Sequence, residues 1–141
     1  MRRKNLKIRK YKNEDIVPIT LLGKELHDDF KFKLDVFSNC LVLEENERVI
    51  GFIIYSVIYD RAEIIDIIID SKYRLKGYGK KLLDYVIDKI KETGCLNVTL
   101  EVACNNLPAI KLYESLGFVV EAKRKNYYDN TDGYLMMLDL R

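Results

Sequence analysis

The sequence contains few of the residues that build metal sites, disulfide frameworks and flexible linkers. Its 141 residues include one His, three Cys, two Pro and seven Gly, and they include no Trp. The cysteines Cys40, Cys95 and Cys104 are odd in number and lack C-x-x-C spacing, which favours free thiols over disulfides. Because His27 is the single histidine and the cysteines are scattered, we predict no metal site.

Long apolar runs and an excess of one charge are also missing. The longest apolar stretch, residues 49–59, is interrupted by Gly51 and Ser56 and is shorter than the roughly 20 residues of a membrane helix. No apolar segment follows the N-terminal MRRKNLKIRK, so we expect no secretory signal, no membrane association and a cytoplasmic protein. Lys and Arg total 24 against 22 Asp and Glu, which argues against a nucleic-acid binder.

The hydrophobic pattern predicts one globular domain over residues 1–141, in which strands and helices alternate. Apolar residues make up 48% and charged residues 33% of the chain, as in globular proteins. Asn13 is the expected N-cap of a first helix, and the spacing of Phe30, Leu34 and Phe37 predicts a second, short helix. The remaining expected elements are strands 6–11, 40–45, 49–58, 63–70, 96–102, 118–122 and 134–140, and helices 78–93 and 107–116.

The central part of this order is a strand–helix–strand crossover. Strand 63–70 is a nearly continuous β-branched run, which predicts a strand covered on both faces. Its crossover through helix 78–93 makes strand 96–102 its expected parallel neighbour. The fold class is therefore α/β (mixed α+β), a mixed sheet with helices on both faces.

A glycine turn, Arg74–Gly79 (RLKGYG), joins the buried strand to the helix. The first N–H groups of a helix have no partner within it and, with the helix dipole, form an anion site. Gly77 and Gly79 lack Cβ, so a phosphate can approach the backbone closely. The surrounding cations are Lys72, Arg74, Lys76, Lys80 and Lys81. We predict phosphate binding here; the alternative is a glycine turn that only starts a helix.

Strand 96–102 and the following helix carry the second group of candidate residues. Glu101 lies near the C-terminal end of its strand, where ligands gather in parallel sheets, and could accept a proton. It could equally be a glutamate on the solvent side of an alternating strand. Taken singly, Asn106 is also consistent with a helix cap, and Tyr113 with a core tyrosine.

Together these motifs resemble the GNAT superfamily of acyl-CoA-dependent N-acetyltransferases. RLKGYG resembles its pyrophosphate loop, [RQ]-x-x-G-x-[GA], and 99–118 resembles its signature L-x-V-x-x-x-N-x-x-A-x-x-L-Y-x-x-x-G-F. Residues 123–138 (KRKNYYDNTDGYLMML) resemble the tail of its RimI-type branch, which acetylates the N-terminal amine of a ribosomal protein. The resemblance implies a mostly antiparallel sheet of six or seven strands with a splayed parallel pair and about four helices.

The resemblance also implies roles for individual residues. Acetyl-CoA would be the co-substrate, and its pantetheine arm would be held by strand residues Ile67, Ile68 and Ile69 and by Asn106. The pyrophosphate would lie on the turn residues Arg74, Leu75, Lys76, Gly77, Tyr78, Gly79 and Lys80. Glu101 would be the general base and Tyr113 the general acid in a direct attack of the amine on the thioester. Tyr127, Tyr128 and Asp132 would border the acceptor.

The acceptor is left open between two classes of amine. An α-amine titrates near 7.7–8.0 and a Lys side chain near 10.4, so an α-amine is the easier task for a lone Glu. A protein N-terminus is therefore the first expectation. The chain lacks the Trp-Ser pair usual in the RimI-type branch near residues 27–35, so a polyamine, amino acid or antibiotic is the alternative. An acyl-CoA-binding regulatory module without turnover is a third reading, and a monomer or homodimer is expected.

Overall fold

The structure is a computed structural model that describes residues 5–141, so the first four residues of the basic N-terminal run lie outside it. The described chain forms strands, α-helices and two short 3-10 helices. The strands are β1 (Leu6–Lys10), β2 (Ser38–Glu45), β3 (Arg48–Ile58), β4 (Arg61–Ile69), β5 (Asn97–Ala103), β6 (Val119–Tyr128) and β7 (Thr131–Asp139). The helices are η1 (Asn13–Asp15), α1 (Ile16–Leu26), η2 (Ser71–Tyr73), α2 (Tyr78–Glu92) and α3 (Leu107–Ser115).

The strands form a seven-stranded sheet in the order β1-β2-β3-β4-β5-β7-β6. The β1–β2, β2–β3, β5–β7 and β6–β7 pairs are antiparallel, whereas β4 and β5 pair in parallel. The mixed, mostly antiparallel sheet and its predicted parallel pair are therefore confirmed. The parallel ladder runs from the pair Arg61–Asn97 to the pair Ile64–Leu100 and ends there, although both strands continue.

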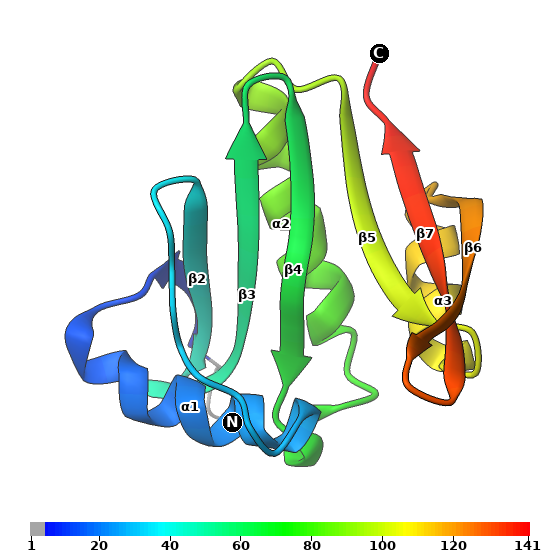
Figure 1. The fold of residues 1–141 in the computed structure, drawn as a ribbon. Helices are drawn as coiled ribbons and strands as arrows, with labels where there is room; N and C mark the ends of the chain where they lie inside the picture. The colour runs from blue at the N-terminus through cyan, green and yellow to red at the C-terminus, as the bar shows by residue number, and fades with distance from the viewer. Residues whose placement is uncertain (1–4) are drawn as a thin grey trace. The chain divides into compact units, whose positions relative to one another are not determined.

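The chain folds as two compact units, one formed by the residues up to Ser56 with Asp66–Tyr85, the other by Val57–Ile65 with Val86–Arg141. In the first unit, helix α1 packs on strands β2 and β3 (Figure 1). Its apolar face contributes to a buried cluster that comprises Ile19, Leu22, Phe30, Cys40, Val42, Phe52, Ile54 and Ile68. Burial raises the pKa of the Cys40 thiol to about 12, so this cysteine is held as a thiol.

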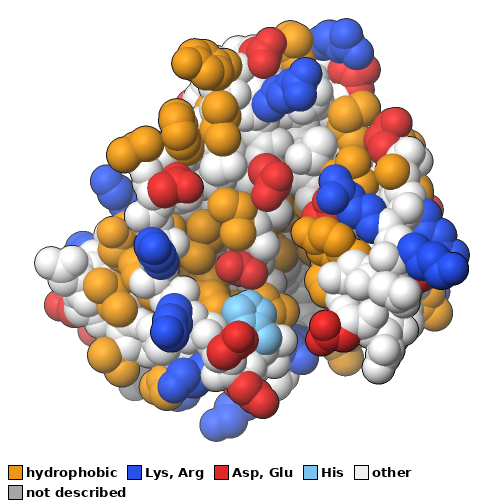
Figure 2. Space-filling model, viewed as in Figure 1, with side chains coloured by type: hydrophobic (Ala, Val, Ile, Leu, Met, Phe, Trp, Pro, Cys, Tyr) orange, Lys and Arg blue, Asp and Glu red, His pale blue; other side chains and the backbone are white. Residues whose placement is uncertain are grey.

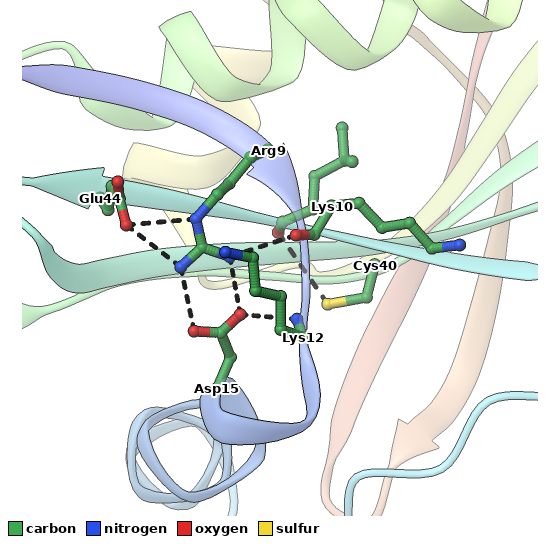
Figure 3. A network of polar contacts seen from close by, with 7 residues as sticks. Arg9, Lys10, Lys12, Asp15, Cys40 and Glu44 are labelled. Atoms are coloured by element: carbon green, nitrogen blue, oxygen red, sulfur yellow. Dashed lines mark hydrogen bonds and ion pairs between the residues drawn. The ribbon is translucent and has the colours of Figure 1, made fainter.

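An ion-pair network fixes the start of α1 against β1 and β2 (Figure 3). Arg9 Nη1 donates to Asp15 Oδ2 at 2.7 Å, Arg9 Nε donates to Glu44 Oε2 at 3.2 Å, and the Lys12 N–H donates to Asp15 Oδ2 at 2.7 Å. Asp15 is buried, with 3% of its surface exposed. The expected cap at Asn13 is therefore wrong: Asn13 begins the 3-10 turn η1, and the buried Asp15 carboxylate fixes the entry to α1.

The short helix expected near Phe30, Leu34 and Phe37 is not formed, since residues 28–37 contain only turns and irregular backbone. Phe30 leaves the helical path to lie against Gly23 in α1, where a Cβ would overlap its ring. Just before it, the histidine His27 ends α1 and pairs with Asp29 at 3.2 Å. Figure 2 shows this histidine at the surface with acidic side chains beside it.

Strand β4 is covered on both faces only in its second half, which corrects the prediction for residues 63–70. Ala62 and Ile64 are buried while Glu63 and Ile65 are exposed, so the first half alternates as a half-buried strand does. Ile68 and Ile69 are both buried. In the first unit, β3 approaches this second half closely at Gly51, where a Cβ would lie 2.9 Å from the Ile68 carbonyl oxygen.

The second unit contains β5, β7, β6 and α3, and the β6–β7 hairpin forms its C-terminal part (Figure 1). Strand β5 alternates, with Val98, Leu100 and Val102 buried between less buried neighbours. Every position of β6 is exposed. The hairpin strands are longer than predicted, because the polar segment that suggested a loop continues both strands up to a turn at Asp129, where φ is 52°. Within residues 5–141 no helix is long and apolar enough to cross a membrane.

Candidate active site

The glycine turn of the first unit adopts the conformation that its sequence predicts. Leu75 and Gly77 both have positive φ, 62° and 78°, and a Cβ added at Gly77 would meet no atom within 4 Å. The backbone next to the first turn of α2 is thus open to an incoming group. Helix α2 begins at Tyr78, and the Lys81 N–H donates to the Gly77 carbonyl at 3.1 Å. This geometry fits an anion held by the helix N-terminus.

Two side chains of the turn point inward and fix its path. Arg74 Nε donates to the Ile69 carbonyl at 3.1 Å, and its guanidinium lies 3.7 Å from Glu25. The Tyr78 hydroxyl donates to Glu45 Oε1 at 2.8 Å, and this bond raises the pKa of Tyr78. The side chains of Arg74 and Tyr78 therefore brace the turn, and the predicted contact of the turn backbone with a pyrophosphate stays a prediction.

The strand segment before the turn consists of Ile67, Ile68 and Ile69. Its end is held to β3, because the Asp70 N–H donates to the Ile50 carbonyl at 2.7 Å. Asp70 also caps η2, with its Oδ1 accepting from the Lys72 N–H at 3.0 Å. The predicted holding of a pantetheine arm by this segment stays a prediction.

An open cavity of about 850 Å³ lies elsewhere in the first unit, beside the Arg9–Asp15–Glu44 network. Lys7 and Arg48 line it together with Glu14 and Glu47, so both charge signs are present. It shares no residue with the glycine turn. Among residues 5–141, no cluster of three or more His, Cys, Asp and Glu could hold a metal ion.

Glu101 in β5 of the second unit has its two carboxylate oxygens in different surroundings. Its Oε1 lies 3.2 Å from Arg124 Nε, whereas its Oε2 is buried without a hydrogen-bond partner in the described chain. Burial raises the pKa of the Glu101 carboxyl, Arg124 opposes this rise, and Glu63 adds to it. Glu101 lies on the less buried side of the alternating strand β5, with 20% of its side chain exposed, and its role as a base stays a prediction.

Tyr113 and Tyr128 are two protonated phenols in the same unit. Tyr113 in α3 is 8% exposed and packs on Phe118, with ring centroids 5.9 Å apart. Burial raises its pKa to about 12. The pKa of Tyr128 also rises to about 12, through burial first and then through the charges of Tyr127, Glu101 and Tyr113. The structure therefore brings Tyr128 and Tyr113 into one electrostatic group with Glu101.

Asp132 of the β6–β7 hairpin stabilises the hairpin itself. Asp132 Oδ1 accepts from the Asn126 N–H at 2.8 Å, and its Oδ2 lies 3.4 Å from Lys123. Both contacts lower the pKa of Asp132. Tyr127 and Tyr128 pack edge to face with centroids 4.9 Å apart. Of the three predicted acceptor residues, the two tyrosines are near Glu101 or its partner Arg124, and Asp132 braces the turn.

Asn106 acts as a helix cap, as its alternative reading stated. Its side-chain oxygen accepts from the Ala109 N–H at 3.3 Å at the start of α3. Sequence reasoning missed Arg124. It stands in the basic run KRK, which is typical of a solvated strand, and its partner Glu101 is distant in sequence.

The chain belongs to the acetyltransferase (GNAT) family, whose model matches residues 11–118. The chain is 41% identical over 91 residues to the [ribosomal protein bS18]-alanine N-acetyltransferase of Escherichia coli strain K12, a match that covers 64% of this chain and 62% of that protein. The chain thus spans less than two thirds of the length of this curated relative.

Two solved structures extend the likeness. The ribosomal-protein-S18-alanine N-acetyltransferase of Escherichia coli superposes with a TM-score of 0.88 at 27% identity, covering 96% of this chain and 94% of that one. A GNAT family acetyltransferase from Elizabethkingia anophelis with acetyl-CoA bound superposes with a TM-score of 0.79 at 22% identity, covering 96% and 99%. The second likeness shows the fold alone.

Proposed function

We propose that the chain is an acetyl-CoA-dependent N-acetyltransferase that acts on the N-terminal amine of a protein, such as a ribosomal protein. Family membership supports acetyl transfer, and the 41% identity to the bS18-alanine enzyme supports a protein N-terminus as acceptor. The observation that carries the proposal is the buried, unpartnered Oε2 of Glu101, because a buried carboxylate oxygen without a partner suits an incoming amine.

The residues present fit the co-substrate. Positive φ at Leu75 and Gly77, open space at Gly77 and the N-terminus of α2 together form an anion cradle for a diphosphate. Bound acetyl-CoA supplies an acetyl thioester and a thiolate leaving group. Within the first unit, Gly77, Gly79 and Lys80 would hold the diphosphate, and Ile67–Ile69 would hold the arm.

The catalytic steps belong to residues of the second unit. Glu101 Oε2 accepts a proton from the acceptor ammonium, directly or through a water, and the neutral amine then attacks the acetyl carbonyl. The tetrahedral adduct expels the thiolate, and its nitrogen gives up a second proton to water as the amide forms. Tyr113 stays protonated at neutral pH and donates its proton to the departing thiolate. Direct transfer needs no acetylated side chain, so the thiols of Cys40, Cys95 and Cys104 have no part in it.

An acetyl-transfer assay read by mass spectrometry tests the proposal. The acceptors are a peptide with a free N-terminal alanine, the same peptide with its N-terminus blocked and an internal Lys, spermidine, and an aminoglycoside. We expect transfer to the free N-terminus, and a loss of turnover of about 10²–10⁴-fold in Glu101→Gln with coenzyme A affinity unchanged. Transfer only to spermidine or the aminoglycoside would show that the acceptor is a small amine and not a protein N-terminus. Full turnover in Glu101→Gln would show that Glu101 is not the base.

A further inference from the structure

Arg124 in β6 contacts Glu101 in β5, although β5 and β6 are not neighbouring strands in the sheet. Strand β7 lies between β5 and β6 in the sheet order. In the registers, Arg124 stands opposite Gly133 of β7, and Gly133 stands opposite Ala103 of β5. Paired residues project to the same face, and Glu101 lies two residues before Ala103, so Arg124 and Glu101 share that face. Gly133, which has no side chain, lies in the row of Arg124 and Ala103, next to the row in which Leu135 pairs with Glu101.

Aromatic packing holds the arginine in this place. The Arg124 guanidinium lies over the Tyr127 ring, 5.5 Å from its centroid. The rings of Tyr127 and Tyr128 fill the space above Gly133, since a Cβ there would lie 3.0 Å from Tyr127 Cβ and 3.1 Å from Tyr128 Cε2. A guanidinium stacked on an aromatic ring keeps a defined orientation, and it is attracted to the ring face.

The ion pair divides the two oxygens of Glu101 into different tasks. Arg124 Nε occupies Oε1 at 3.2 Å and leaves Oε2 buried without a partner in the described chain. A carboxylate with one oxygen fixed cannot rotate freely, so the direction of the other oxygen is set. That free oxygen is the one from which a proton acceptor would act.

Arg124 opposes the other influences on the ionisation of Glu101. Glu63 faces it from β4, Tyr128 and Arg124 face it from β6, and Tyr113 of α3 interacts with Tyr128. Burial and Glu63 both raise the pKa of the Glu101 carboxyl, and Arg124 is the group that lowers it. Without Arg124, the remaining influences act in one direction and favour the protonated acid.

We propose that Arg124, steadied by Tyr127, is a positioning residue that clamps Oε1 of Glu101 and presents Oε2 to the acceptor amine. The catalytic part of this inference rests on the proposed function. This role of Arg124 would couple the β6–β7 hairpin to the base, because the β6 residue that packs on Tyr127 also sets the direction of the Glu101 carboxylate.

Arg124→Gln is the test variant, and Lys125→Gln is the matched control because Lys125 is the exposed neighbour on the same strand. We expect Arg124→Gln to lower kcat at pH 7 by about ten- to a hundredfold, the range for a displaced catalytic group. The defect should be larger at pH 6 than at pH 8, since a carboxyl with a raised pKa needs a higher pH to act as base. Lys125→Gln should match the wild type at each pH.

A direct titration separates this inference from the proposed function. The 13C signal of the Glu101 carboxyl, assigned with Glu101→Gln, should titrate at higher pH in Arg124→Gln than in the wild type and Lys125→Gln. An unmoved midpoint together with an unmoved kcat would overturn the clamp. If Glu101→Gln is fully active, the proposed base fails, whereas the titration still reports the clamp.

Arg124→Lys keeps the test open if the glutamine variant does not fold. A lysine restores the charge but not the planar fork, so the Glu101 midpoint should return towards the wild-type value while kcat stays reduced. Wild-type kcat in Arg124→Lys would show that charge alone matters and would overturn the positioning role.

Discussion

The Tyr78 hydroxyl and the Glu45 carboxylate form a buried hydrogen bond of 2.8 Å between the first residue of α2 and the last residue of β2. This bond joins the glycine turn to the β2–β3 hairpin within the first unit. A buried carboxylate that loses a hydrogen-bond donor becomes costly, so breaking this bond costs more free energy than forming it contributes.

Tyr78→Phe should therefore lower the free energy of unfolding by about 1.5–3 kcal/mol, measured by urea denaturation. Tyr59→Phe is the control, because Tyr59 is 93% exposed. We also expect weaker coenzyme A binding in Tyr78→Phe by calorimetry, since α2 starts at this residue. Equal stability of the two variants would mean that the bond contributes nothing.

The variants Gly77→Ala and Gly94→Ala form a matched pair, which separates the effect of backbone strain on stability from an effect on coenzyme A binding. Both glycines have positive φ, 78° and 83°, and a Cβ at either would meet no atom within 4 Å. Each alanine should cost about 1–2 kcal/mol of stability. Only Gly77→Ala should also weaken coenzyme A binding, by about tenfold or more in calorimetry, a loss of about 1.4 kcal/mol. Equal affinity in both variants would remove the turn from the binding surface.

Asp15→Asn should remove part of the acid sensitivity of the fold. The hydrogen bond from Arg9 lowers the pKa of Asp15 in the folded state, so its contribution is present above the unfolded pKa of about 3.9 and is lost as pH falls through the folded pKa. At pH 7 the variant should be about 2 kcal/mol less stable, and the gap should narrow below pH 4. The exposed Asp28→Asn is the control, and thermal melts from pH 2 to 7 measure both.

Tyr113→Phe should slow turnover by about 10²-fold without changing coenzyme A affinity. Because the pKa of Tyr113 is about 12, the wild-type hydroxyl should not titrate below pH 10. Tyr128→Phe is the informative comparison, since the pKa of Tyr128 is also about 12 and it interacts with Glu101. A loss of turnover in Tyr128→Phe alone would transfer the acid role from Tyr113 to Tyr128.

Local patterns were enough for the elements around the glycine turn. Helix 78–93 is observed as Tyr78–Glu92 and strand 96–102 as Asn97–Ala103, because regular hydrophobic spacing marks both. The prediction of a short helix within residues 27–37 was wrong, for a reason that is not local in sequence. Phe30 packs on Phe52, with centroids 5.7 Å apart, and Phe32 packs on Tyr11 at 5.0 Å, so the apolar spacing reflects separate anchors on the sheet rather than one helix face.

The candidate site was predictable where a motif is continuous in sequence. Glu101 and Tyr113 were found through the second signature, and their assigned roles stay proposals. Arg124 could not be predicted from sequence, because its contact with Glu101 depends on the register of three strands and on the missing side chain of Gly133. No pattern within the run 123–125 distinguishes the arginine that pairs with Glu101 from its lysine neighbours.

Because β3 approaches β4 closely at Gly51, a change at this residue would alter the segment proposed to hold the pantetheine arm. A single methyl group at Gly51 would collide with Ile69 Cδ1 at 2.7 Å and with the Ile68 carbonyl at 2.9 Å, so it would shift the main chain of Ile68 and Ile69. An alanine at Gly51 would therefore displace the segment Ile67–Ile69 from the neighbouring strand β3, without any change in the segment itself.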